Sequence, residues 1–154
     1  MGPGRIPISR RSALAKAGLV ALAAILAPRM AFADADGVTA ELKKLYGDKK
    51  FAAGKIKLDI PEIAENGLVV PVTIDVESPM TDADYVAAVH IFADGNPVPT
   101  VATYRFTPAC GKASASTRMR LAQTQNVICI AEMSTGALFS AKSNVKVTIG
   151  GCGG

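Results

Sequence analysis

A single cysteine close to the end of the chain has neighbours that suit a thiol on a mobile tether. Cys152 stands in the terminal stretch Gly150-Gly151-Cys152-Gly153-Gly154. Glycine has no Cβ and loses the most conformational freedom when it is ordered, so this stretch is unsuited to a core or a strand. The three residues from Ile149 to Cys152 reach about 10 Å when extended. We therefore expect residues 150–154 to form a flexible arm that carries a thiol into a narrow cleft of another protein. The alternative is a frayed terminus with an incidental cysteine.

Two further cysteines, Cys110 and Cys129, make the total odd. In an oxidising compartment an odd count leaves one thiol over, and Cys152 is then the unpaired one. Cys110 follows an expected strand and Cys129 lies within one, so the two could form a disulfide. They could equally be free, buried or semi-buried thiols that pack as small hydrophobic side chains. Spacing alone does not decide between these two interpretations.

Residues 1–33 have the pattern of an export signal. Arg10 and Arg11 form a twin-arginine pair, and an apolar run of eleven residues follows at 17–27. That run is too short to span a bilayer, which needs about 20 residues. The small residues Ala31 and Ala33 predict cleavage after Ala33, with a second site two residues later as the alternative. We expect a twin-arginine (Tat) signal peptide that is removed, rather than a membrane anchor that stays.

Removing the leader changes the charge of the protein. The whole chain has 17 basic and 13 acidic residues, and five of the bases but none of the acids lie in residues 1–33. The remaining domain then has 12 bases against 13 acids, which is a net charge near −1. This near-balance excludes nucleic-acid binding as a class, because the basic character belongs to the leader. The 121 residues that remain suit one domain with one core.

The period of the apolar residues predicts a β-domain preceded by one helix. Residues 36–46 place Val38, Leu42, Leu45 and Tyr46 on one helical face, with an end at Gly47. From residue 55 onward apolar residues alternate, and turn residues separate about seven strands. The strands are expected near 55–60, 68–76, 85–93, 98–107, 117–121, 127–133 and 145–149. We predict an all-β, antiparallel, immunoglobulin-like sandwich over residues 34–149, followed by the arm.

Few other residues suggest chemistry. His90 is the only histidine, so it cannot build a metal site without further ligands in view, and we expect it to be structural. Arg118 and Arg120 alternate with apolar residues on an expected strand. They could meet an anion on the sheet face, but solvated surface charge is the expected role. We predict no catalytic residue, no metal site and no cofactor.

The arm, the leader and the stretch Ile60-Pro61-Glu62-Ile63-Ala64-Glu65-Asn66-Gly67 together resemble the SoxY family. SoxY is the sulfur-carrier subunit of the periplasmic thiosulfate-oxidising (Sox) system. The resemblance covers essentially the whole chain and implies that Cys152 is the covalent attachment site. Cys110 and Cys129 are not part of the family pattern, so it implies no role for them.

The resemblance also implies partners and a location. A SoxZ-like β-sandwich subunit would form a heterodimer with this chain in the periplasm. A c-type haem enzyme would conjugate thiosulfate to Cys152, and a hydrolase would release sulfate and leave a persulfide. In some organisms a sulfane dehydrogenase oxidises the outer sulfur. No membrane contact is expected after the signal is cleaved.

The residues around Cys152 predict a carrier rather than an enzyme. No Lys, Arg or His lies near Cys152 in sequence, and the terminal carboxylate of Gly154 disfavours a thiolate. Activation of the thiol must then come from the partner enzymes. A redox protein would need a resolving cysteine near the arm, and none exists. The remaining alternative is an exported interaction domain whose terminal cysteine forms an intersubunit disulfide.

Overall fold

The computed structural model describes the backbone of residues 35–149 and the side chains from residue 37 onward. The predicted leader of residues 1–33 and the predicted arm of residues 150–154, with Cys152, lie outside the described residues. Within the described part no helix is long and apolar enough to cross a membrane.

Eight strands follow one helix in the described residues. The helix α2 spans Ala35–Tyr46. The strands are β1 (Ile56–Asp59), β2 (Ile63–Ala64), β3 (Val70–Val76), β4 (Val86–Ala93), β5 (Thr100–Arg105), β6 (Ala113–Met119), β7 (Gln125–Met133) and β8 (Leu138–Val147). A 3₁₀ turn, η1 (Pro108–Cys110), connects β5 to β6.

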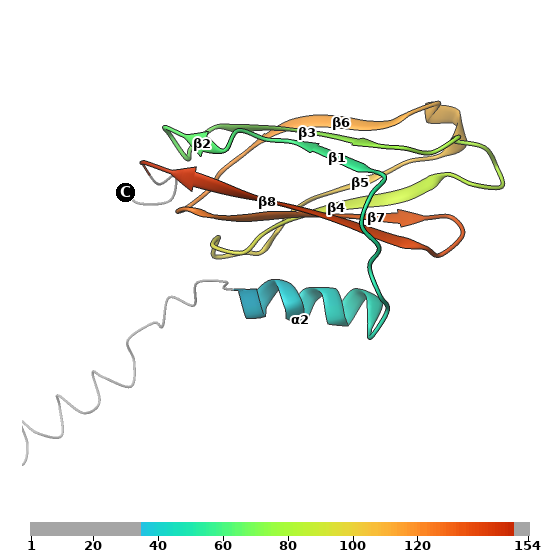
Figure 1. The fold of residues 1–154 in the computed structure, drawn as a ribbon, viewed down its shortest axis with the longest axis horizontal. Helices are drawn as coiled ribbons and strands as arrows, with labels where there is room; N and C mark the ends of the chain where they lie inside the picture. Colours follow the sequence, from blue (N-terminus) through green and yellow to red (C-terminus); the bar gives the residue numbers. More distant parts are fainter. Residues whose placement is uncertain (1–34, 150–154) are drawn as a thin grey trace, which may run out of the picture. The chain divides into compact units, whose positions relative to one another are not determined.

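The strands form two sheets that face each other (Figure 1). The three-stranded sheet has the order β1-β3-β6, and the five-stranded sheet has the order β2-β8-β7-β4-β5. This arrangement confirms the predicted all-β sandwich. One pair departs from the predicted antiparallel pattern, because β2 pairs with β8 in parallel. Pro71 lies in β3 beyond the ladder with β1, which covers only residues 73–76 of β3, so its missing N–H interrupts no pairing on that side.

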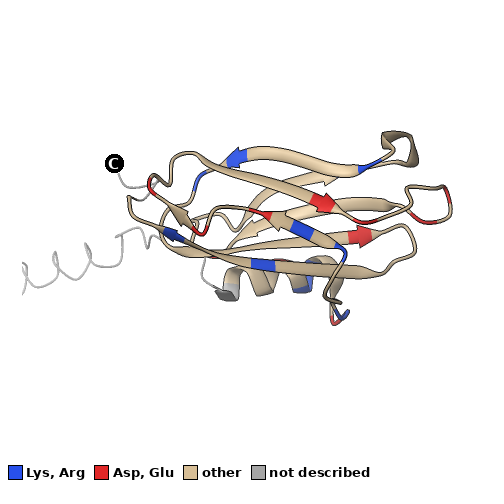
Figure 2. Ribbon diagram, turned by 45° about the horizontal axis from the view of Figure 1, so that its top comes forward, with Lys and Arg blue, Asp and Glu red and all other residues tan. Residues whose placement is uncertain are grey.

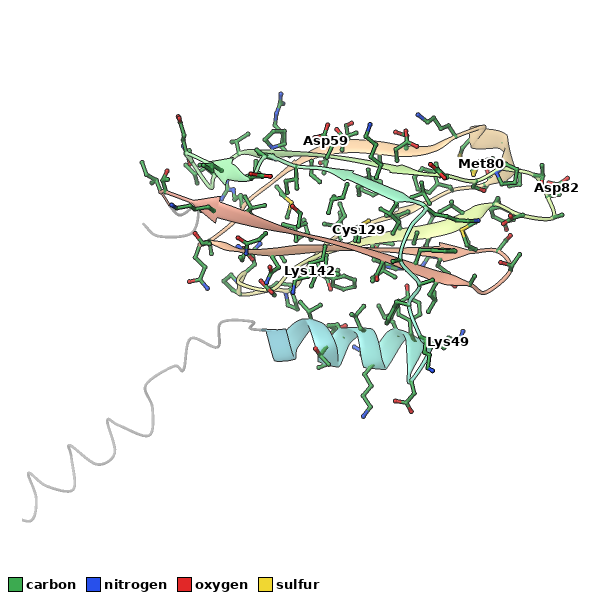
Figure 3. All side chains as sticks on the ribbon, viewed as in Figure 1. Lys49, Asp59, Met80, Asp82, Cys129 and Lys142 are labelled. Atoms are coloured by element: carbon green, nitrogen blue, oxygen red, sulfur yellow. The ribbon has the colours of Figure 1, made fainter. Side chains whose placement is uncertain are left out.

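The core lies between the two sheets and is built by the alternating side chains of their strands. Its largest fully buried members include Ile74 from β3, Ile91 from β4 and Val127 from β7, together with Leu121 from the connection after β6. Cys129 of β7 also points into this interior (Figure 3). The inward positions therefore satisfy the period-two pattern that predicted the strands.

The helix α2 covers the outer face of the five-stranded sheet. Val38 packs against the buried residues Phe92 and Ile130, with Leu42 and Tyr46 beside them. The helix ends where predicted, because Gly47 adopts a positive φ of 61° and its N–H bonds to the Lys43 carbonyl at 2.8 Å. Leu45 was predicted to share the buried face of the helix, but its side chain is 49% exposed.

Phe92 packs against α2, and replacing it should lower the stability of the protein. Phe92→Ala should lower the free energy of unfolding by about 3–5 kcal/mol, because the cavity would open beneath α2. Phe139→Ala is the matched control in the same sheet. Its ring is only half-buried and carries Lys55 Nζ 5.2 Å from its centroid, so we expect a loss under about 2 kcal/mol. Chemical denaturation of both variants measures this; equal losses would contradict the packing described.

Candidate functional site

The end of β8 is the described part of the chain that lies nearest in sequence to Cys152. β8 ends at Val147, and the described chain continues through Thr148 and Ile149. Cys152 and the four glycines of the predicted arm fall outside the described residues, so their geometry is not part of the structure. The structure does define the surface that precedes residues 150–154 in the chain. It is formed by residues 62–67 and the end of β8 through Ile149, and we call it the arm root.

Residues 62–67 hold the end of β8 along one side. This segment belongs to the stretch that carried the family resemblance, and it includes the short strand β2. Four hydrogen bonds join it to the end of β8 and the two residues that follow: Lys146 N–H to Glu62 O at 2.8 Å, Thr148 N–H to Ala64 O at 3.1 Å, Thr148 Oγ1 to Glu65 O at 2.8 Å, and Gly67 N–H to Ile149 O at 2.8 Å. The backbone is therefore fixed as far as the Ile149 carbonyl.

Thr124 holds β8 from its other side. The Thr124 hydroxyl accepts a hydrogen bond from Val147 N–H at 3.0 Å and donates to the Val147 carbonyl at 3.4 Å. Gly67 links the arm root to the core, because its carbonyl accepts from the N–H of Leu121, which is fully buried. Neither Thr124 nor Thr148 was expected from the sequence to lie at this site. The stretch 60–67, which carried the family resemblance, did point to this region.

A second network braces the same end of the sandwich. The amide of the buried side chain Gln125 accepts a hydrogen bond from Gly95 N–H at 2.7 Å and donates to Asn96 Oδ1 at 2.9 Å. Gly95 must be glycine here, since a Cβ would lie 2.9 Å from the Cβ of Gln125. Asn96 in turn bonds to the Arg120 carbonyl and the Ala122 N–H on either side of Leu121. The loop that contacts Gly67 is thus held rigidly.

Exposed apolar side chains gather at the arm root. Six large hydrophobic side chains are exposed among the described residues, and four of them belong to segments that contact β8 here: Ile63, Leu68, Val69 and Ile149, at 45–67% exposure. We call these four the arm-root patch. Ile63 is in register with Lys146 of β8, while Leu68 and Val69 follow Gly67 directly. We interpret these exposed apolar side chains as a candidate contact surface for another protein.

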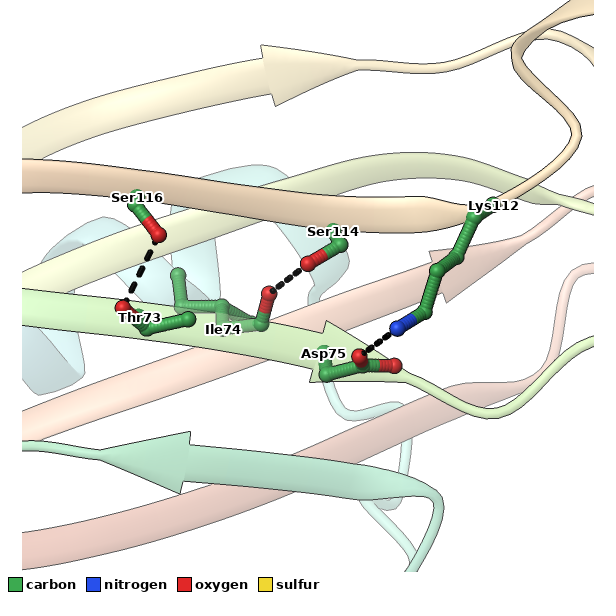
Figure 4. A network of polar contacts seen from close by, with 6 residues as sticks. All are labelled: Thr73, Ile74, Asp75, Lys112, Ser114 and Ser116. Atoms are coloured by element: carbon green, nitrogen blue, oxygen red, sulfur yellow. Dashed lines mark hydrogen bonds and ion pairs between the residues drawn. The ribbon is translucent and has the colours of Figure 1, made fainter.

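The outer face of the three-stranded sheet is polar and largely satisfied by its own residues. Thr73 Oγ1 lies 2.9 Å from Ser116 Oγ, Ser114 donates to the Ile74 carbonyl at 3.2 Å, and Lys112 pairs with Asp75 (Figure 4). Arg118 lines a shallow hollow beside Thr73 and Ser116. Arg118 and Arg120 are exposed, as expected for solvated surface charge. Figure 2 shows acidic and basic residues on both sheets, which fits the near-balanced charge of the domain.

Cys110 and Cys129 are free thiols in the structure, and the disulfide that the sequence left open is not formed. Cys129 is buried in β7, and burial raises its pKa to about 12. Cys110 is exposed in η1, contrary to the buried position expected for a free thiol. Hydrogen bonds from Thr107, whose hydroxyl lies 3.7 Å from the sulfur, lower the pKa of Cys110. The two thiols thus differ in both access and acidity.

His90 lies under α2 and makes contacts that suit a structural role. Its Nδ1 lies 3.0 Å from Thr103 Oγ1, and its ring stands edge-on to Tyr46 with 6.1 Å between centroids. Burial lowers the pKa of His90, while the Glu132 carboxylate acts in the opposite direction. Burial also raises the pKa of Tyr46 to about 12, with Glu132 adding to the effect. Among residues 37–149 no three side chains of His, Cys, Asp or Glu come together in a way that could hold a metal ion.

Solved structures with the same fold include a carrier and several reductases. The sulfur carrier protein SoxY from Chlorobium limicola f thiosulfatophilum is 32% identical with a TM-score of 0.63, over 75% of this chain and 100% of that chain. A superoxide reductase (neelaredoxin) from Ignicoccus hospitalis is 17% identical with a TM-score of 0.54, over 61% of this chain and 80% of that one. A putative superoxide reductase from Thermotoga maritima is 18% identical with a TM-score of 0.51, over 69% and 89%. At such low identity the reductases share the fold alone.

The sequence also matches a protein family directly. The family described as sulfur oxidation protein SoxY matches residues 42–152, which is most of the chain. No curated protein sequence is similar enough to count as a match. The family match and the 32% identity to a complete SoxY chain agree with the resemblance carried by the terminal motif and the stretch 60–67. The chain therefore belongs to the SoxY family.

Proposed function

We propose that this protein carries sulfur in thiosulfate oxidation as a covalent adduct on Cys152. Membership of the SoxY family supports a carrier role in sulfur oxidation, and the observation that carries the finer proposal is that the family match extends to residue 152. The arm root adds a physical reason, because the backbone is hydrogen-bonded up to Ile149, three residues before Cys152. The thiol then has about 10 Å of reach from a fixed point.

The chemistry on the thiol follows in balanced steps. The Cys152 thiolate and thiosulfate lose two electrons to a c-type haem enzyme and form a sulfur–sulfur bond, which gives Cys–S–S–SO₃⁻. Water then cleaves the bond to the sulfonate group in a hydrolase, which releases hydrogen sulfate and leaves the persulfide Cys–S–SH. A sulfane dehydrogenase, where present, adds the oxygen atoms of three water molecules to the outer sulfur, which gives Cys–S–SO₃⁻ with loss of six electrons and seven protons. The carrier supplies the thiol, and the enzymes supply the catalysis.

Cys110 is the rival thiol, and its setting argues against it. It is exposed and its pKa is lowered, so it can react with small molecules. Its backbone is held in η1, where Cys110 N–H bonds to Thr107 O at 2.9 Å and Gly111 N–H bonds to Pro108 O at 3.0 Å. A side chain on such a turn cannot reach deep into an enzyme channel. Delivery to several buried active sites therefore requires Cys152 on its glycine tether.

The arm-root patch is the surface that we assign to the enzymes. Any enzyme that takes up Cys152 must approach Ile149 to within the reach of the tether, so its channel mouth meets this patch.

We further propose export through the Tat pathway to the periplasm and a heterodimer with a SoxZ-type subunit. The family has Sox-system partners of this kind.

Replacing Cys152 should abolish function without harming the fold. Cys152→Ser should remove thiosulfate-dependent electron transfer in the reconstituted system, while the unfolding transition stays that of the wild type. Cys110→Ser is the matched control and should keep full electron transfer. Activity of Cys152→Ser together with loss of activity in Cys110→Ser would assign the carrier role to Cys110 and contradict the proposal.

Cys110 and Cys129 should also differ in their reactivity toward iodoacetamide. Cys110 should be alkylated with a pH midpoint below that of an ordinary thiol, because its lowered pKa provides thiolate at lower pH. Cys129 should stay unmodified in the native protein across neutral pH, since it is buried and its pKa is about 12. Peptide mapping after a timed pulse at several pH values measures this. Alkylation of native Cys129 at the rate of Cys110 would show that the core is not as described.

The hydrogen bonds at the arm root should be measurable by amide exchange. Thr148→Val removes the hydroxyl bond to Glu65 O, worth about 0.5–1.5 kcal/mol, so the Gly67 amide should exchange roughly 2- to 10-fold faster. Thr73→Val removes a comparable hydroxyl contact on the other sheet and should leave Gly67 unchanged. Equal Gly67 exchange in both variants would mean that Thr148 does not hold the arm root.

A further inference from the structure

We propose that the free edge of β5 is where a second β-sandwich subunit docks, by adding its own edge strand to the five-stranded sheet. This inference rests on the heterodimer in the proposed function and names the surface that forms it. The occupant is defined by its chemistry: an extended strand whose backbone N–H and C=O groups complete the ladder of β5. Main-chain hydrogen bonds supply affinity in this mode, and pockets for alternate side chains supply specificity.

The four edges of the two sheets differ in how they are protected. Natural sheets protect edges by making them short or by placing charges on them. β2 has two residues and β1 has four, with Lys57 and Asp59 in it. β6 has Lys112 just before it, and Arg118 and Arg120 near its other end. β5 has six residues with neither proline nor lysine, and its single charge is Arg105 at its last position.

The core is also less well covered along β5 than along β6. The first and last residues of β6, Ala113 and Met119, are buried at 1% and 4% exposure and close the core on that side. The apolar side chains of β5 that pack on the core are only partly buried: Val101, Ala102 and Tyr104. An added strand beside β5 would cover these side chains, which gives the interface an apolar contribution.

The alternation of hydrogen-bonded and non-bonded pairs between β4 and β5 shows which backbone groups of β5 point outward. Phe106 N–H bonds to the Ala87 carbonyl at 3.1 Å, directly after the register pair Ala88–Arg105. In an antiparallel ladder bonded and non-bonded pairs alternate, so the pair His90–Thr103 is of the non-bonded kind. Thr103 and Arg105 therefore direct their N–H and C=O groups away from β4. No strand in residues 35–149 pairs with that side of β5.

A cleft of about 590 Å³ lies beside this edge and offers a pocket for a side chain of the incoming strand. It is lined by Glu41, Leu45, His90, Thr100, Thr103 and Arg105. Two of these residues come from α2 and three from β5, so the cleft lies between the helix and the edge strand. Leu45, which lies outside the buried face of α2, supplies apolar surface here, and its side chain is 49% exposed.

The position of β5 in its sheet leaves the arm root free. β8 carries the arm root and pairs with β2, whereas β5 lies three strands away at the opposite edge of the same sheet. Three strand spacings are about 14 Å. A subunit held permanently on β5 would thus leave the arm-root patch open to enzymes that come and go. This separation favours a permanent partner on β5 over a transient enzyme.

A matched pair of variants at one position tests the backbone contact. Thr103→Pro removes the outward N–H and the hydroxyl, whereas Thr103→Val removes only the hydroxyl that contacts His90. Titration calorimetry with the purified SoxZ-type subunit of the same organism should give an affinity at least about tenfold weaker for Thr103→Pro. Thr103→Val should bind as the wild type does. Equal affinity of folded Thr103→Pro and Thr103→Val would overturn the proposal.

A second pair separates the two surfaces and does not depend on a proline. Leu45→Lys and Leu68→Lys place the same charge at side chains of 49% and 45% exposure. Leu45→Lys should weaken binding of the SoxZ-type subunit, and Leu68→Lys should leave it unchanged but slow turnover by the arm-dependent enzymes. The reverse pattern, or a homodimer of this chain that Leu45→Lys disrupts, would overturn the assignment. Should Thr103→Pro fail to fold, the Leu45 and Leu68 pair decides alone.

The two proposals fail in different ways. Mass spectrometry of the C-terminal peptide reports sulfur on Cys152 whether or not β5 is the docking edge. Sulfur on Cys152 together with wild-type affinity in folded Thr103→Pro and in Leu45→Lys would reject the docking edge and keep the carrier function. Absence of sulfur on Cys152 in active wild-type protein would reject the carrier function whatever the affinities are.

Discussion

Backbone hydrogen bonds between residues 62–67 and the end of β8 set the point from which the last five residues start. The reach of the Cys152 thiol is limited, because the three residues from Ile149 to Cys152 span about 10 Å when extended. Under the proposed carrier function, an enzyme that receives the Cys152 thiol would have to meet the surface around Ile149, where the arm-root patch lies. A fixed origin with a short tether would then keep the thiol close to the docked enzyme, and a small contact would let the carrier leave.

The two edges of the five-stranded sheet differ in ways that suit the two roles we propose for them. One edge, with β2 and β8, is closed by a two-residue strand and carries the arm root. The other edge, β5, is longer and less protected, and it lies beside a cleft against α2. The helix connects these features, since Val38 and Phe92 fix it to the sheet while Leu45 stays exposed. Under the two proposals, a permanent partner and transient enzymes would use different surfaces of one small domain.

Apolar periodicity predicted the sandwich and the helix, and it failed where strands are held by their neighbours. The expected strand at 145–149 begins at Leu138 in the structure, because residues 140–144 are mostly polar and join the sheet through pairing with β7. The strand β2 was not predicted, because two residues shortly after Pro61 are too few to show an alternating apolar pattern. Exposure of Cys110 and Leu45 depends on tertiary packing that spacing does not encode. The terminal glycines and Cys152 could be recognised from sequence, but the hydroxyl contacts of Thr124 and Thr148 could not.

Fold alone would not have distinguished this protein from superoxide reductases, which share the sandwich at 17–18% identity. The central claim concerns one sulfur atom, so the most direct measurement is the mass of the C-terminal peptide from protein isolated during thiosulfate turnover, without reducing agent. The account predicts a mixture of thiosulfate-derived and persulfide adducts on Cys152, which reductant removes, with Cys110 and Cys129 unmodified. Adducts on Cys110 alone, or a Cys152 found only in a disulfide-linked dimer, would contradict it.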